Sequence, residues 1–163
     1  MTEQESQVDA TAADARWLRA AIAAARQASA GGNAPFGAVL VAADGTLLLE
    51  AGNTVLATRD ITAHAELNAV RAATARFDAA TLAGATLYAS TEPCPMCTAA
   101  IFWSGIGRVV FGLRGARLRE ETDPTGARPT LRLTCRDVLA TSTRPVAVVG
   151  PLLEDEALAV HAP

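Results

Sequence analysis

The sequence predicts an α/β fold of three layers (α/β/α), in which helices cover both faces of a mixed, five-stranded central sheet. Apolar segments of strand length alternate along the chain with segments whose apolar residues recur at helical spacing. The first two strand segments are joined by Asp44-Gly45, which is typical of an antiparallel hairpin. The later strands follow helices, and such crossovers favour parallel pairing. The sheet is therefore expected to contain both strand directions.

In the first half of the chain, Gly31-Gly32 marks the end of the first helix and Thr62 is a typical N-cap for the second. The predicted elements are a helix over residues 17–28, strands over 36–43 and 46–51, a helix over 63–77 and a strand over 82–89.

In the second half, Pro95 is well placed as the first residue of a helix, because that position needs no N–H donor. The predicted elements are a helix over 95–104, a strand over 108–112, a short helix over 116–121, a fifth strand over 145–149 and a last helix over 153–160. Residues 123–129 read as a loop, and the pattern over 130–139 is ambiguous.

The composition is that of an ordinary globular protein, with 50% hydrophobic and 19% charged residues. We expect one domain over residues 1–163, with the polar residues 1–8 disordered. The formal net charge is −3 and all 14 basic side chains are arginine. Because proteins that grip a phosphate backbone usually carry a basic excess, we expect no nucleic-acid partner.

The three cysteines do not form a disulfide framework, because their number is odd and Cys94 and Cys97 make a Cys-x-x-Cys pair. This predicts a reducing, cytoplasmic location. No apolar run approaches the ~20 residues of a membrane span, and the first residues lack the apolar core of a secretion signal. We therefore expect no membrane partner.

Two short motifs carry the chemistry, and each falls at the start of a predicted helix. They are His64-Ala65-Glu66 and Pro93-Cys94-Pro95-Met96-Cys97. Alone, the histidine fits a surface or core residue, the glutamate fits a helix-dipole interaction, and the cysteine pair fits a redox site or half of a structural zinc site. Together they supply one imidazole and two thiolates at two helix N-termini, which are ligands that zinc prefers.

Three ligands indicate a catalytic zinc site. A closed structural site needs four protein ligands, and the remaining candidates, Cys135 and His161, have no motif partner. The fourth position is then open to water, which zinc makes more acidic. Glu66 lies two residues from His64, so it is close to the metal without being needed as a ligand, and we predict that it moves protons.

These motifs resemble those of the cytidine deaminase superfamily, whose signature joins His-x-Glu with Pro-Cys-x-x-Cys. The branch of bacterial guanine deaminases, fungal cytosine deaminase and tRNA adenosine deaminases is the most similar, over about residues 20–112. The shared segments are Pro35-Phe36-Gly37-Ala38-Val39, Thr62-Ala63-His64-Ala65-Glu66, Thr86-Leu87-Tyr88 and Glu92-Pro93-Cys94-Pro95-Met96-Cys97. The resemblance implies one Zn²⁺ per chain, a cytidine deaminase-like fold and a homodimer.

The resemblance also implies residues that contact the substrate. Asn53 corresponds to an asparagine that reads the edge of the base, although it also suits a loop. Trp103 matches a tryptophan of bacterial guanine deaminases that packs against the base, and core packing is an equal alternative. Phe36 fits either a stacking role or the core, and Ala65 is assigned to the same pocket.

We expect the substrate to be a free nucleobase or nucleoside, with a guanine-type purine favoured because of Trp103. The alternatives are cytosine and the adenosine of a tRNA. The tRNA enzymes share Ile106-Gly107-Arg108-Val109-Val110-Phe111-Gly112, but their following Lys-Thr-Gly segment and basic C-terminal helix are absent here. The acidic residues Glu120, Glu121 and Asp123 are candidates for pairing with guanine N–H groups.

Two readings without deamination stay open at the sequence level. The zinc ion could only hold two helices together in a binding module, or Cys94 and Cys97 could be a redox pair. The redox reading leaves His64 and Glu66 unexplained.

Overall fold

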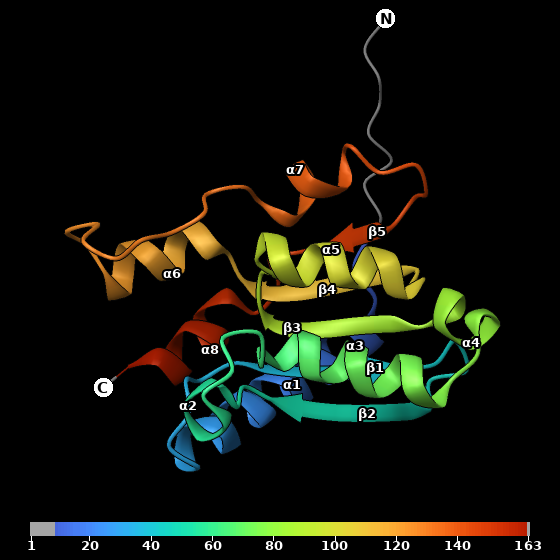
Figure 1. Ribbon diagram of the computed structural model, residues 1–163, viewed down its shortest axis with the longest axis horizontal. Coiled ribbons are helices and arrows are strands. Elements are labelled where there is room, and N and C mark those ends of the chain that lie inside the picture. The colour runs from blue at the N-terminus through green and yellow to red at the C-terminus, as the bar shows by residue number, and fades with distance from the viewer. Residues whose placement is uncertain (1–8, 163) are drawn as a thin grey trace, which may run out of the picture.

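The computed structural model describes residues 9–162, and the prediction for residues 1–8 lies outside them. Its centre is a five-stranded sheet in the order β2-β1-β3-β4-β5 (Figure 1). The strands are β1 (Gly37–Val41), β2 (Leu47–Gly52), β3 (Thr86–Thr91), β4 (Arg108–Leu113) and β5 (Ala147–Val149). β1 is antiparallel to both β2 and β3, whereas β3, β4 and β5 are parallel. The predicted mixed sheet of five strands is confirmed.

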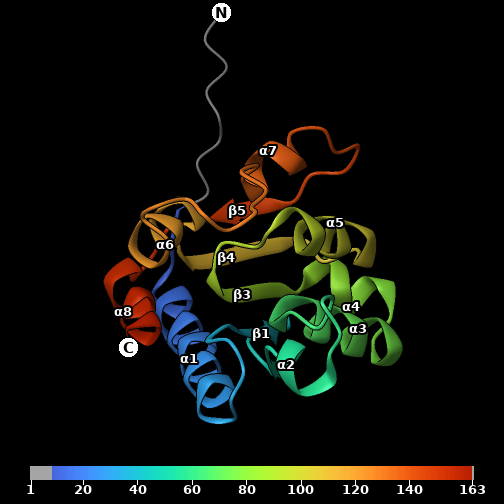
Figure 2. The same cartoon turned by 60° about the vertical axis from the view of Figure 1, so that its left-hand side comes forward.

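Helices cover both faces of this sheet, as Figure 2 shows. The long helix α1 (Ala12–Ala30) packs on one face together with α8 (Glu154–Leu158), which continues into a 3₁₀ turn, η1 (Ala159–His161). Helices α3 (Ala65–Arg76) and α5 (Pro95–Ser104) pack on the other. The three predicted layers are therefore present.

The interior strand β1 is buried along its whole length, and its side chains alternate between the two layers. Val39 and Val41 belong to the cluster with α1, whereas Ala38 and Leu40 belong to the cluster with α3 and α5. Gly37 starts this strand where it meets α1, and a Cβ atom there would lie 2.2 Å from the carbonyl oxygen of Ala21. Glycine is therefore needed for the helix to approach the sheet this closely.

The remaining helices are short and lie at the ends of strands. They are α2 (Val55–Thr58), α4 (Ala79–Gly84), α6 (Gly115–Thr122) and α7 (Cys135–Leu139). α7 packs on α5, while α6 and the chain after it extend beyond the end of β4 (Figure 1). The ambiguous residues 130–139 contain an extended segment followed by α7, which starts with a capping box between Thr134 and Asp137.

Several boundaries differ from the prediction by a few residues; for example, the first helix already begins at Ala12. At two boundaries a side-chain hydrogen bond explains the difference. α3 begins two residues later than predicted, with His64 and not Thr62 as its N-cap, because Thr62 bonds back to Asp60 in a tight turn. Residues 79–84 form α4 and not the start of a strand, because the Asp78 side chain accepts a hydrogen bond from the Thr81 N–H and caps a helix there. The third strand consequently starts at Thr86.

Within residues 9–162, no helix combines the length and the apolar character that crossing a membrane requires.

Candidate metal centre and active site

The three predicted metal ligands meet between the first turns of α3 and α5. His64 is the N-cap of α3 and Cys94 is the N-cap of α5, with Cys97 in the first turn of α5. The Nδ1 atom of His64 lies 3.7 Å from the Sγ atom of Cys94 and 3.5 Å from that of Cys97. All three donor atoms lie within 4.8 Å of one another.

These distances fit a tetrahedral zinc site. With Zn–S and Zn–N bonds of the usual length, donor atoms on a tetrahedron are roughly 3.5–3.8 Å apart. The donor set of one imidazole and two thiolates also suits zinc, and no other cluster of three or more possible ligands occurs in residues 9–162. The site can therefore hold one zinc ion through His64, Cys94 and Cys97, as predicted.

The position of Cys94 favours the thiolate that zinc needs. Hydrogen bonds from Cys97 and then from His64 lower the pKa of Cys94 to about 4. In turn, the hydrogen bond with Cys94 raises the pKa of His64. The N-terminus of α5 adds its own positive potential at this place.

Glu66 lies beside the metal ligands but is not one of the three donors. Its carboxylate oxygen Oε2 is 3.7 Å from the Sγ atom of Cys97, and only 6% of the residue is exposed. Burial raises the pKa of Glu66 to about 7. A carboxyl group in this environment is suited to both accepting and releasing a proton near neutral pH, although a zinc cation beside it favours the ionised form.

A cavity of about 210 Å³ opens above this cluster. Its inner wall contains His64, Glu66, Cys94 and the ring of Phe36. The hydroxyl of Thr91, on the last residue of β3, also belongs to this wall and has no hydrogen-bond partner in the described chain. Because buried hydroxyls are nearly always satisfied, this group points to a bound water molecule or ligand.

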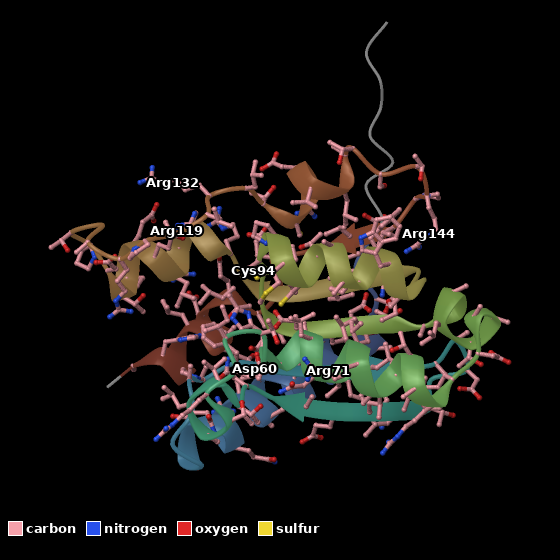
Figure 3. All side chains as sticks on the ribbon, in the orientation of Figure 1. Asp60, Arg71, Cys94, Arg119, Arg132 and Arg144 are labelled. Atoms are coloured by element: carbon pink, nitrogen blue, oxygen red, sulfur yellow. The ribbon has the colours of Figure 1, made fainter. Side chains whose placement is uncertain are left out.

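The outer wall of the cavity comes from residues 115–134, which we call the roof segment. It consists of α6 and the extended chain that leads to α7. Its residues at the cavity are Gly115, Ala116, Leu118, Arg119, Thr130, Leu131, Arg132, Leu133 and Thr134. In Figure 3 the roof segment, marked by Arg119 and Arg132, lies beside Cys94.

Glu92 ties both ends of the roof segment to the metal-binding loop, and the sequence did not single it out. One carboxylate oxygen accepts a 3.1 Å hydrogen bond from the N–H of Gly115, where α6 begins. The other accepts a 3.1 Å bond from the N–H of Cys135, where α7 begins. Glu92 precedes Pro93-Cys94 directly, so the cavity wall is anchored two residues from a metal ligand. Only its place in the motif could have drawn attention to it.

Of the four residues predicted to contact the substrate, one lines the cavity and three do not. Phe36 lies at the cavity. Asn53 is buried, accepts a hydrogen bond from the Val55 N–H and borders a different hollow, next to α1. Ala65 is fully buried in the core beneath α3. Trp103 lies on α5 outside the cavity, with 81% of the residue exposed.

The two leftover candidates, Cys135 and His161, do not join the metal donors. Cys135 is buried against Ala89 and Phe111, and burial raises its thiol pKa to about 12. The ring of His161 packs edge-on against Phe36, with centroids 5.1 Å apart, and so supports the aromatic wall of the cavity from the C-terminal side.

Comparison with known proteins agrees with this geometry. Residues 11–113 match the family described as the cytidine and deoxycytidylate deaminase zinc-binding region. This chain belongs to that family. The matched range contains all three metal ligands and Glu66, so the chain is a zinc-dependent deaminase, and the predicted resemblance is confirmed.

The relatives within the family act on different bases. The chain is 44% identical to a probable cytosine deaminase of Schizosaccharomyces pombe, over 91% of this chain and 90% of that protein. It is 40% identical to a tRNA-specific adenosine deaminase of Agrobacterium fabrum over 59% of this chain, and the match spans only 62% of that relative. The solved guanine deaminase of Nitrosomonas europaea has a TM-score of 0.74 at 27% identity, covering 96% of this chain and 86% of the other.

Zinc should bind at close to one ion per chain, and the donors should be separable by substitution. Cys94→Ser and Cys97→Ser should each remove most of the metal, because each takes away one of three donors, whereas Cys135→Ser should retain it. Metal analysis of the purified variants measures this. A requirement for Cys135 would mean that the site has four protein ligands and no open position.

Glu92→Gln should loosen the roof segment without releasing zinc. The amide can accept at one oxygen only, so one of the two anchoring N–H groups loses a charge-assisted hydrogen bond worth ~1.5–3 kcal/mol. We expect KM to rise about tenfold or more, and limited proteolysis within residues 115–134 to become faster.

Glu120→Gln is the matched control, because Glu120 is an exposed carboxylate on α6 that does not line the cavity. Equal KM and proteolysis rates in the two variants would contradict the anchoring role of Glu92.

Proposed function

We propose that this protein hydrolytically deaminates a free nucleobase or nucleoside, with a guanine-type purine as the first choice. The observation that carries the proposal is the metal-binding trio with Glu66 beside it at the base of a 210 Å³ cavity. A cavity of this size is smaller than the ~300–1,000 Å³ of sites for drug-sized ligands, which suits a single base.

The residues of the site suggest how the reaction proceeds. Zinc, when bound, supplies Lewis-acid activation of a water molecule. Glu66 would take one proton from that water and pass it to the ring nitrogen of the base, and would then take the second proton from the added hydroxyl and pass it to the departing amino group. Water adds its oxygen to the ring carbon, the carbon–nitrogen bond breaks and ammonia leaves. Phe36, held by His161, forms an apolar face against which the base can lie.

Cytosine is the second candidate base. It is supported by the similarity to the probable cytosine deaminase of S. pombe over about nine-tenths of both chains. We still favour a purine, because a further hollow beside α6 adjoins the cavity and offers space for the second ring of the base. Trp103 no longer argues for guanine within one chain, since it lies outside the cavity. None of the acidic residues Glu120, Glu121 and Asp123 lines the 210 Å³ cavity, and Glu120 and Asp123 border only the further hollow.

A tRNA substrate is disfavoured by the charge of the chain. The net charge is −3, and no basic residue other than His161 follows Arg144. Binding an anticodon stem would require several phosphates to be neutralised.

The deciding experiment is a panel of guanine, guanosine, cytosine, cytidine, adenine and a tRNA anticodon stem-loop, followed by ammonia release and inosine formation. We expect turnover of small substrates and none of the stem-loop. Glu66→Gln should keep zinc and fold but lose about 10²- to 10⁴-fold in rate.

Inosine formation in the stem-loop without turnover of any small substrate would overturn the substrate class. Near-normal turnover by the Glu66→Gln variant would remove the proposed proton transfer. Absence of all turnover in a zinc-loaded protein would leave only a zinc-stabilised binding module.

We further propose that two copies of the chain form a homodimer that covers the outer end of α5. The indole of Trp103 is 81% exposed and packs edge-on against Phe102, with centroids 5.0 Å apart, so two aromatic rings meet at this surface. Trp103→Glu should then weaken association, as measured by sedimentation equilibrium. A wild-type monomer at micromolar concentration would contradict the dimer.

A further inference from the structure

We propose that Arg119 and Arg132 form a second subsite of the catalytic cavity, which binds an anionic group on the substrate, the 5′-phosphate of a nucleoside monophosphate. This inference rests on the proposed deamination and narrows its substrate class from bases and nucleosides towards nucleotides. Three observations support it: both guanidinium groups lie at the cavity, neither forms an ion pair in the described chain, and an adjoining hollow offers space for a ribose and a phosphate.

Both arginines line the same cavity as His64, Glu66 and Cys94. Arg119 belongs to α6 and is partly buried, while Arg132 lies on the extended chain that leads to α7. Figure 3 shows the two on neighbouring segments, on the same side of Cys94. A ligand that enters from the roof segment towards the metal donors therefore passes both of them.

Neither arginine has an ion-pair partner among residues 9–162. Two other arginines at the start of α6 do have ion-pair partners. Arg114 pairs with Glu154, and Arg117 pairs with Glu154 and Asp155, so both are engaged by α8. Arg119 and Arg132, in contrast, line the cavity and make no ion pair in the described chain. A guanidinium group is permanently charged and its fork of donors matches a phosphate.

The acidic groups nearby form no ion pair with either arginine in the described chain. Glu92 uses its two carboxylate oxygens for the N–H groups of Gly115 and Cys135. Asp123 accepts hydrogen bonds from its own loop, including the N–H of Arg128. Glu120 borders the outer hollow and makes no ion pair in the described chain. Among residues 9–162, the guanidinium groups of Arg119 and Arg132 therefore keep their N–H donors available for an anionic ligand.

The space beyond the base also fits a nucleotide. An adjoining hollow of about 850 Å³ shares Arg119, Arg132 and part of the roof segment with the 210 Å³ cavity. It includes a third arginine, Arg128. With the base at the metal centre, a ribose and its phosphate would extend into this hollow, past both guanidinium groups. A free base, even a purine whose second ring enters the hollow, would leave most of the hollow and its arginines without a contact.

The test compares guanosine with guanosine 5′-monophosphate, using the zinc-loaded full chain, and cytidine with its 5′-monophosphate in case the base is a pyrimidine. We expect kcat/KM to be about tenfold or more higher for the monophosphate, as for a hydrogen bond to a charged group. Arg119→Gln and Arg132→Gln should each reduce this preference, and the double variant should abolish it, so that the ratio of kcat/KM for the monophosphate to kcat/KM for the nucleoside falls to about one. Arg76→Gln, an exposed arginine on α3, is the matched control.

Binding provides a readout that does not depend on turnover. Calorimetric titration of the Glu66→Gln protein should show the monophosphate binding about tenfold or more tightly than the nucleoside, with the difference lost in the double arginine variant and reduced by salt. Equal binding of the two ligands, or a phosphate preference that survives the double variant, would overturn the subsite.

The outcomes separate this inference from the proposed function. Turnover of nucleosides without any effect of the phosphate rejects only the subsite, whereas no ammonia from any base, nucleoside or nucleotide rejects the deamination. A stem-loop that competes more tightly than the monophosphate, and does so through Arg119 and Arg132, would assign these charges to RNA and also overturn the subsite.

Discussion

Three donor atoms from two helices must lie within one zinc coordination sphere, and most of the architecture serves this constraint. His64 and Cys94 can face each other because α3 and α5 lie side by side on one face of the sheet and start at the same end of it. Each ligand at a cap position has extended backbone geometry, which turns its side chain away from its own helix. The helix N-termini also provide the positive potential that stabilises thiolates. The deaminase site is therefore a property of helix packing as much as of the motifs.

The strand pairing that holds these helices in place is buried on both faces. β1 and β3 lie in the middle of the sheet, and their residues alternate between the layer of α1 and the layer of α3 and α5. Gly37 allows the backbone of α1 to approach β1 directly. Because the layers are close-packed, the ends of α3 and α5 have little freedom to move apart, which is what a preorganised metal site needs.

The outer wall of the cavity comes from a different part of the chain than the candidate metal ligands. The metal ligands and Glu66 fall inside the shared region 11–113, whereas the outer wall of the cavity comes from residues 115–134. Relatives with cytosine, guanine and tRNA adenosine activities can therefore share one catalytic centre. Glu92 connects the two parts, because its carboxylate holds both ends of the roof segment while its backbone leads into Cys94. The roof segment therefore lies outside the shared region and yet borders the same cavity as the candidate metal ligands.

The sequence by itself determined the mixed sheet, most of the helices, and which three residues come together as candidate metal ligands with Glu66 beside them. These depend on local signals: apolar periodicity, the turn at Asp44-Gly45, and ligand spacings within single helical turns. Tertiary structure decided the roles of Glu92 and of the roof segment, because their contacts join residues 23 and 43 positions apart, which no local pattern records. It also placed Trp103 at the surface, since an apolar side chain near a helix end carries no information about which neighbours surround it. Local patterns specify which groups a chain offers, and only packing over long sequence separations specifies which of them meet.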